Sequence, residues 1–194
     1  MDAAVKLFAE KGYPSVSNRE IAQAAGANTA LISYYFGSKE GLYVQAFQTQ
    51  FSTACQALAA IRNQQALTPV ERIEQCALAV LESHRKHPHL LRFVQHELVN
   101  PSTASSQVLH ACTGDLLRYL EELVEEGKEA GAFHAELNTS YAALMLCNLM
   151  HSYLLHKNVV AAVLPEFGEE QEYVMHNLSI YFRGVLAEKT VGGA

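Results

Sequence analysis

The stretch LISYYFGSKEGLY, residues 31–43, places two adjacent tyrosines shortly before a lysine. Neighbouring positions of an α-helix point about 100° apart, so a helix that contains Tyr34 and Tyr35 does not bury both on one face. At least one hydroxyl is therefore expected to face outwards and to be available to a partner. Lys39 follows within a few residues and adds a positive charge beside that hydroxyl.

The sequence around this stretch predicts three short helices followed by a longer one. Gly12 and Gly26 are expected to end the first two helices, because glycine readily adopts the conformation that terminates a helix. Ser17, Asn28 and Ser38 are expected to cap the helices that follow, and Ser17 begins the S-x-x-E pattern of a capping box. The tyrosine pair then lies at the end of the third helix.

The second and third helices, joined by the residues AGAN, follow the helix-turn-helix plan. In this motif the second helix of the pair enters the major groove of DNA and places residues near its N-terminus against base edges. Here those residues are Asn28, Thr29, Ala30 and Ser33, whose small side chains allow the backbone to approach the groove. The sequence therefore predicts an N-terminal DNA-binding region.

The charge distribution supports the same location for DNA contact. The first 43 residues carry four positive and four negative side chains, whereas the remainder carries ten and sixteen. An acidic body repels nucleic acid, so any DNA contact is expected in the neutral N-terminal part.

Nearly every other segment also has helical periodicity, and no alternating strand pattern appears, so the predicted fold is all-α. We expect a helix-turn-helix domain over residues 1–45 and a larger helical domain over residues 46–194. The helices expected in the larger domain cover about 38–61, 69–87, 89–99, 109–127, 140–163 and 169–188, with a serine-rich loop over 100–106.

The last two predicted helices are apolar on most sides. Such helices must be covered on most sides, and a chain of 194 residues has few layers for this purpose. We expect residues 140–163 and 169–188 to pair with a second copy as a four-helix bundle around a two-fold axis. The alternative is that both are central helices of a monomer.

Other classes of protein find little support. The four cysteines are widely spaced, and no nucleophile elbow, P-loop, dinucleotide fingerprint or HExxH motif occurs, so neither an enzyme nor a cofactor is predicted. The histidine-rich residues 83–89 lack ligand spacing and are interpreted as a solvated helix end, with a metal site as the alternative. No apolar run is long enough to span a membrane, and the expected location is the cytoplasm.

The runs LFAEKGY, SNREIAQAAGA and FGSKEGLY, in this order, resemble the DNA-binding domain of the TetR family of transcriptional repressors. The resemblance covers residues 3 to about 47, roughly a quarter of the chain. It implies a homodimer that binds a palindromic double-stranded DNA operator and a larger domain for ligand binding and dimerisation. A small apolar or amphipathic effector would release the DNA. Members of that family usually begin some residues earlier, with a basic segment, so we expect either residues before Met1 or a lower affinity for DNA.

The resemblance also implies a role for individual positions. Thr29, Ala30 and Ser33 fall where members of the family touch bases. The positions expected at the DNA backbone are Ser17, Asn28, Tyr35 and Lys39, with Tyr34 as a further candidate. Leu31, Ile32 and Phe36 are expected in the core, where they hold the recognition helix in place.

The effector is expected inside the larger domain, and the helix that follows Ser38 would act as the lever between the two domains. Candidate pocket residues combine apolar bulk with occasional polar groups. They are Phe93, His96, Tyr119, Leu120, Met150 and His151. Each of them could instead be an ordinary core residue. The alternative function is a helical DNA-binding or protein-interaction module without an effector.

Overall fold

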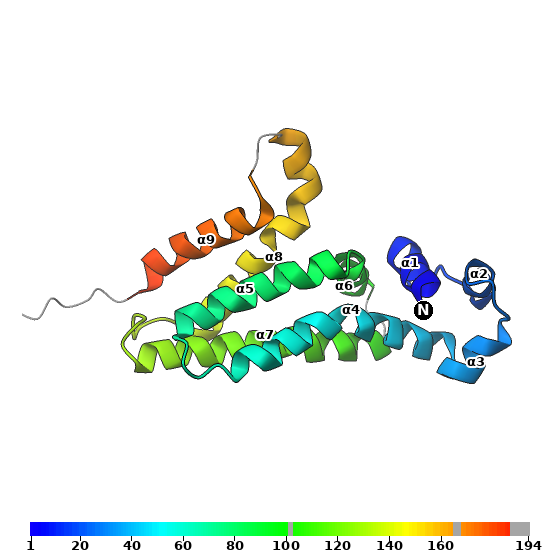
Figure 1. Ribbon diagram of the computed structural model, residues 1–194, viewed down its shortest axis with the longest axis horizontal. Coiled ribbons are helices and arrows are strands. Elements are labelled where there is room, and N and C mark those ends of the chain that lie inside the picture. Colours follow the sequence, from blue (N-terminus) through cyan, green and yellow to red (C-terminus); the bar gives the residue numbers. More distant parts are fainter. Residues whose placement is uncertain (101–102, 165–167, 187–194) are drawn as a thin grey trace, which may run out of the picture. The chain divides into compact units, whose positions relative to one another are not determined.

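The computed structural model describes residues 1–100, 103–164 and 168–186, and these ranges contain nine α-helices (Figure 1). They are α1 (Asp2–Lys11), α2 (Asn18–Ala24), α3 (Ala30–Phe36), α4 (Lys39–Arg62), α5 (Pro69–Lys86), α6 (Leu90–Val99), α7 (Thr103–Glu129), α8 (Thr139–Val163) and α9 (Glu170–Val185). Within the same ranges the one extended pairing is an isolated bridge between Phe133 and Leu186. The all-α prediction is therefore confirmed.

The chain forms two compact units. Unit 1 contains Met1–Gln56 and Glu82–Gly114, and unit 2 contains Ala57–Leu81 and Asp115–Ala194. Helices α4, α5 and α7 thus contribute residues to both units. Neither unit begins or ends at residue 45, the boundary expected between DNA-binding and effector functions. That functional boundary stays a prediction, because compact packing and DNA contact are different properties.

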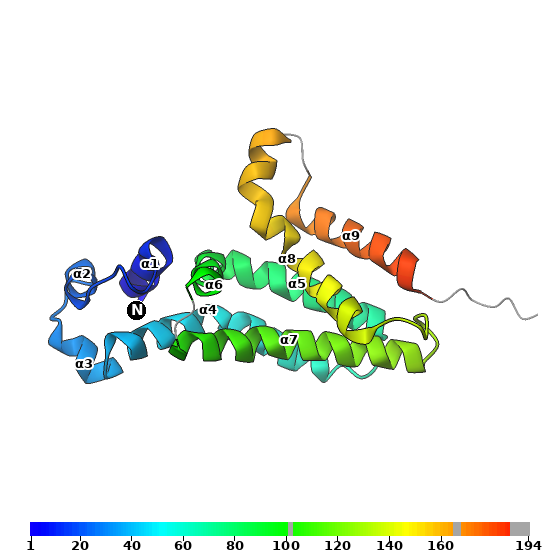
Figure 2. The same cartoon turned by 180° about the vertical axis from the view of Figure 1, so that it is seen from behind.

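Unit 1 has an aromatic core that joins the first helices to α6. Tyr43 of α4 lies 4.9 Å from Phe8 of α1 and 5.6 Å from Phe93 of α6, measured between ring centroids. Its hydroxyl donates a 2.7 Å hydrogen bond to the buried carboxylate of Glu97. Helices α1 and α6 pack against each other, as both views show (Figure 1, Figure 2). This core holds α1 and the start of α4 in fixed positions beside α6.

In unit 2, α8 packs along α9 (Figure 2). The hydroxyl of Tyr181 donates a 3.2 Å hydrogen bond to the carbonyl of Ala142, and the rings of Phe133 and Phe182 stack 6.4 Å apart. A Cβ atom on Gly127 of α7 would lie 2.2 Å from the Phe133 ring, so the close approach of these two residues requires glycine.

The start of α7 differs clearly from prediction. Helix α7 begins at Thr103, so the predicted loop over 100–106 is wrong from that residue onwards. Serine and threonine are common at helix starts, and the buried Val108 and Leu109 anchor the first turns that follow. Residues 101 and 102, and the last two residues of the predicted helix 169–188, lie outside the described ranges. None of the helices in those ranges is long and apolar enough to cross a membrane.

Candidate nucleic-acid interface

Helix α3 presents one buried side and a broad exposed side. Ile32 is 5% exposed and belongs to the core of unit 1. The residues predicted to touch bases, Thr29, Ala30 and Ser33, are all exposed. The structure therefore brings the three predicted base-reading residues together on the accessible surface at the N-terminal end of one short helix.

Tyr34 and Tyr35 extend this surface toward the C-terminal end of α3. Their side chains are 79% and 67% exposed, and their rings meet edge to face with centroids 4.9 Å apart. Neither residue takes part in a hydrogen bond among the described residues. Each ring thus restrains its neighbour while both hydroxyls remain available to an external acceptor.

The turn before α3 has the geometry that the sequence predicts. Gly26 has φ of 61°, a left-handed conformation that glycine adopts without strain. The N–H of Ala27 donates to the carbonyl of Ala22 at 2.9 Å, which closes the end of α2. The Asn28 side-chain oxygen accepts a 2.8 Å hydrogen bond from the N–H of Ala30, so Asn28 caps α3.

Ser17 forms the predicted capping box at the start of α2. Its hydroxyl oxygen accepts from the N–H of Glu20 at 3.2 Å, and its own N–H donates to the Glu20 carboxylate at 2.8 Å. Lys11 pairs with the same carboxylate at 3.0 Å. The hydrogen bonds from Ser17, followed by Lys11, lower the pKa of Glu20 to about 2. Ser17 therefore orients α2, and its phosphate contact stays a prediction.

Lys39 is partly buried and makes contacts that sequence reasoning did not identify. Its ammonium donates to the carbonyls of Tyr13 and Val16, at 3.0 and 2.8 Å, and lies 4.3 Å from the centroid of the Tyr13 ring. These contacts fasten the turn between α1 and α2 to the start of α4, which Ser38 caps through the N–H of Gly41 at 3.0 Å. An ammonium has three protons, so one donor of Lys39 is left for the predicted phosphate contact.

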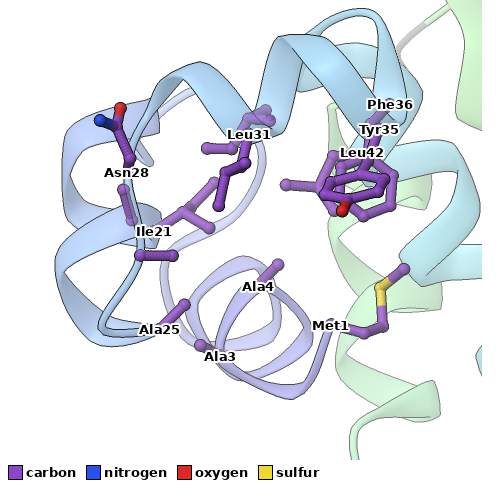
Figure 3. Close-up of a pocket in the computed structure, with 13 residues that line it drawn as sticks. Met1, Ala3, Ala4, Ile21, Ala25, Asn28, Leu31, Tyr35, Phe36 and Leu42 are labelled. Carbon is purple, nitrogen blue, oxygen red and sulfur yellow. The ribbon is translucent and has the colours of Figure 1, made fainter.

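Leu31 is a correction to the predicted core. It is 42% exposed and lines a recess of about 180 Å³ between the first three helices and the start of α4 (Figure 3). Ala3, Ala22 and Ala25 border the same recess, and small side chains cannot cover a leucine completely. Ile32 and Phe36 do pack against the core, as expected.

Arg19 is a candidate that the sequence analysis missed. It lies exposed in the first turn of α2, and no ion pair among the described residues uses it. Lys11 and Lys39 are both held by groups of the protein itself, whereas Arg19 offers a positive charge in the first turn of α2 that is free of such ion pairs among the described residues. Its position within the capping box, in the first turn of α2, was the available signal, because helix N-termini commonly face phosphates.

Helices α8 and α9 expose the apolar surface expected of a dimer. Ala143, Leu146 and Met150 of α8 are fully buried within unit 2. A second stripe on α8 faces outwards at helical spacing, and α9 adds one further side chain. These exposed residues are Tyr141, Leu144, Met145, Leu155, Val159, Val163 and Ile180, each between 49% and 75% exposed. An exposed apolar surface of this kind marks an interaction site.

The candidate effector residues fall in different units. Phe93 and His96 belong to unit 1, where Phe93 is fully buried and the His96 Nε2 lies 3.2 Å from the carbonyl oxygen of Ala9. The other four belong to unit 2: Tyr119, Leu120 and Met150 are buried, and His151 is partly buried with its Nδ1 2.7 Å from the carbonyl oxygen of Cys147. Their contact with an effector stays a prediction.

Comparison with known proteins matches both parts of the chain. The family described as bacterial regulatory proteins, tetR family, matches residues 1–46, and the tetracyclin repressor-like C-terminal domain matches residues 69–177. The HTH-type transcriptional repressor NicS of Pseudomonas putida is 26% identical over 84% of this chain and 78% of its own length. The probable HTH-type transcriptional regulator YttP of Bacillus subtilis is 29% identical over 95% of this chain and 91% of its own. The ketosteroid transcriptional regulator KstR2 of Mycobacterium tuberculosis shares the fold, with a TM-score of 0.75, 18% identity, and coverage of 96% of this chain and 93% of that one.

Proposed function

The chain belongs to the TetR family of bacterial regulatory proteins, and we propose that it represses transcription by binding a palindromic operator in the cytoplasm. It is a DNA-binding transcriptional regulator and not an enzyme, as the family and the matching repressor NicS indicate. The observation that carries the proposal is the exposed face of α3, where small base-reading side chains lie beside two tyrosine hydroxyls.

The roles on this face divide by chemistry. Thr29 and Ser33 offer hydroxyls to base edges, which carry sequence information. Tyr35, with Tyr34 beside it, donates to phosphate oxygens, which carry none. The N-termini of α2 and α3, which follow Ser17 and Asn28, offer further backbone N–H groups to phosphate oxygens. The DNA backbone would thus fix the position of α3 while two or three side chains read the sequence.

A dimer explains the exposed apolar stripe of α8 together with Ile180 of α9. Pairing these helices around a two-fold axis covers the stripe in both copies. Two recognition helices of such a dimer contact half-sites about 34–36 Å apart, one turn of DNA. The operator is therefore expected to be palindromic with that spacing.

An effector would act by favouring the form that does not bind DNA. A shift from 1:99 to 99:1 between the two forms requires about 5.5 kcal/mol of preference. Burial of a small apolar or amphipathic molecule provides energy of this order, at about 25 cal/mol per Å². Helix α4 begins directly after α3 and is the element through which the recognition helix would move.

Selection of bound sequences from random DNA, with the full chain, tests the proposal. We expect enrichment of a palindrome whose half-sites are about one helical turn apart. A variant that carries Thr29→Ala and Ser33→Ala should select a different or degenerate half-site, because only base contacts are removed. Failure of the unmodified chain to enrich any sequence, at salt low enough for non-specific binding, would refute operator binding.

A further inference from the structure

Unit 2 contains two buried hydrogen-bond donors for which the described residues supply no acceptor. The side chain of Arg72, on α5, is 5% exposed, and its Nε has no partner there. Tyr119, on α7, is 3% exposed, and its hydroxyl likewise has none among the described residues. Native proteins rarely leave such groups unpaired, so an acceptor from outside these residues is expected.

The two donors lie close to each other. The Tyr119 side chain lies within hydrogen-bonding reach of the Arg72 guanidinium, which partly offsets the effect of burial on the pKa of Tyr119. The geometry of this contact is poor, so neither Arg72 Nε nor the Tyr119 hydroxyl has a well-oriented partner among the described residues. Burial raises the pKa of Tyr119, so the hydroxyl keeps its proton and can donate. Glu126, which is half-exposed, accepts from the Nη2 of Arg72. Glu126 thus occupies Nη2 of Arg72, while the Nε hydrogen stays unpaired among the described residues.

Further positive charge surrounds the ring of Tyr119. The guanidinium carbon of Arg62 lies 4.8 Å from the ring centroid. Arg62 donates to a carboxylate oxygen of Asp115 at 3.2 Å, and Arg118 donates to the other oxygen at 3.3 Å. Two guanidinium groups, those of Arg62 and Arg72, therefore lie close to Tyr119. Two inward donors, one of them on a guanidinium, favour an anionic acceptor over a neutral one.

We propose that Arg72 Nε and the Tyr119 hydroxyl bind one carboxylate group of an amphipathic effector. This inference rests on the proposed function and names the chemical class of its ligand. The apolar part of the ligand would lie among buried aliphatic side chains on the same three helices, α4, α5 and α7. These are Leu58, Ile61, Ile73, Leu120 and Leu123.

Calorimetric titration of the full chain, without DNA, tests the site with hexanoate, octanoate and decanoate, and with octanol as the uncharged partner of octanoate. We expect octanoate to bind at least about tenfold more tightly than octanol, because octanol lacks the charge that strengthens both hydrogen bonds. Tyr119→Phe should weaken octanoate about tenfold and octanol by a clearly smaller factor, because the hydrogen bond to a neutral oxygen is weaker than the one to a carboxylate. Arg72→Lys keeps a charge for Glu126 but removes the Nε donor, and should have the same selective effect.

Arg85→Lys is the matched control, because Arg85 is an exposed arginine of the same helix that pairs with Glu82. Its octanoate affinity should equal that of the unmodified chain. The site is refuted if none of the three alkanoates binds, if octanol binds as tightly as octanoate, or if Tyr119→Phe weakens both probes equally. The last result would mean that the two donors serve packing or a buried water.

A second measurement separates this inference from the proposed function. Operator binding is measured with and without saturating octanoate, using a DNA site obtained by selection. If octanoate releases the operator and Tyr119→Phe reduces this release, both the carboxylate site and the proposed function are supported. Selective octanoate binding that leaves operator affinity unchanged keeps the carboxylate site and removes its role as an effector site. If the chain binds a selected operator but none of the alkanoates, the proposed function stands and the carboxylate site is refuted.

Discussion

Removal of one hydroxyl from α3 provides a sharp test of the DNA interface. Tyr35→Phe deletes an oxygen from a side chain that is 67% exposed and makes no hydrogen bond among the described residues. The ring and its edge-to-face contact with Tyr34 remain. The free energy of unfolding should therefore change by less than about 0.5 kcal/mol, as for other exposed positions.

The effect on DNA binding should be much larger. A hydrogen bond to a charged group contributes about 1.5–3 kcal/mol, and a dimer places two copies of Tyr35 on one operator. The expected loss is about 3–6 kcal/mol per operator, and even its lower limit weakens binding about a hundredfold, since about 1.4 kcal/mol corresponds to a factor of ten. The factor should be similar for all DNA sequences, because phosphates carry no base identity.

Salt dependence distinguishes this contact from a charged one. Affinity is measured by fluorescence anisotropy on the selected operator and on scrambled DNA, over a range of salt concentrations. Tyr35→Phe should lower affinity by the same factor at every salt concentration. Arg19→Gln should instead reduce the slope of log affinity against log salt by about 1.8, or about 0.9 for each subunit. A Tyr35→Phe variant within twofold of the unmodified chain, or one with a new sequence preference, would contradict the backbone contact.

Four further outcomes are expected. Ser33→Ala should cost about 1–3 kcal/mol at one position of each half-site and leave affinity for scrambled DNA unchanged, as measured by anisotropy on single-base operator variants. Leu144→Lys should weaken the dimer at least about thirtyfold, as measured by sedimentation. Each subunit loses about 1 kcal/mol of apolar burial and places a lysine charge in the interface between the two subunits. The pKa of the Glu20 carboxylate is lowered from 4.5 to about 2, so the capping box stabilises α2 fully above pH 4.5. This stabilisation should be lost as the pH falls toward 2, and circular dichroism should record a loss of helix. The variant Glu20→Gln should lack this transition. The sulfur atoms of Cys55 and Cys112 lie 3.6 Å apart, so diamide should join them within one chain by removing two protons and two electrons, and mass spectrometry should find the linked peptides.

Sequence reasoning succeeded where the cause is local. Ser17, Asn28 and Ser38 cap their helices as predicted, because a capping side chain reaches backbone N–H groups only two or three residues away. Gly26 adopts its left-handed conformation for an equally local reason. The presence of the helices and their order along the chain follow from such capping signals and from apolar periodicity.

It failed where the cause lies elsewhere in the chain. Lys39 donates hydrogen bonds to carbonyls 26 and 23 residues away, and the sequence around Lys39 does not predict those partners. Leu31 has the apolar character of a core residue, but its exposure depends on how α1 and α2 border the recess. Arg72 lies in a helix whose surface is rich in charge, and its burial is set by α7, far along the chain.

The contacts within unit 1 bear on how the recognition helix could move. The predicted lever was α4 alone, but α6 holds both α1 and α4: His96 bonds to Ala9, and Glu97 accepts from Tyr43. Gly12 also lies against the imidazole of His96, where an added Cβ would be 3.2 Å from Nδ1. Separating α6 from α1 and α4 would break these hydrogen bonds and open the packed aromatic core, which is costly. The three helices should therefore move as one body, so an effector would reach α3 by displacing α6 as well as by tilting α4.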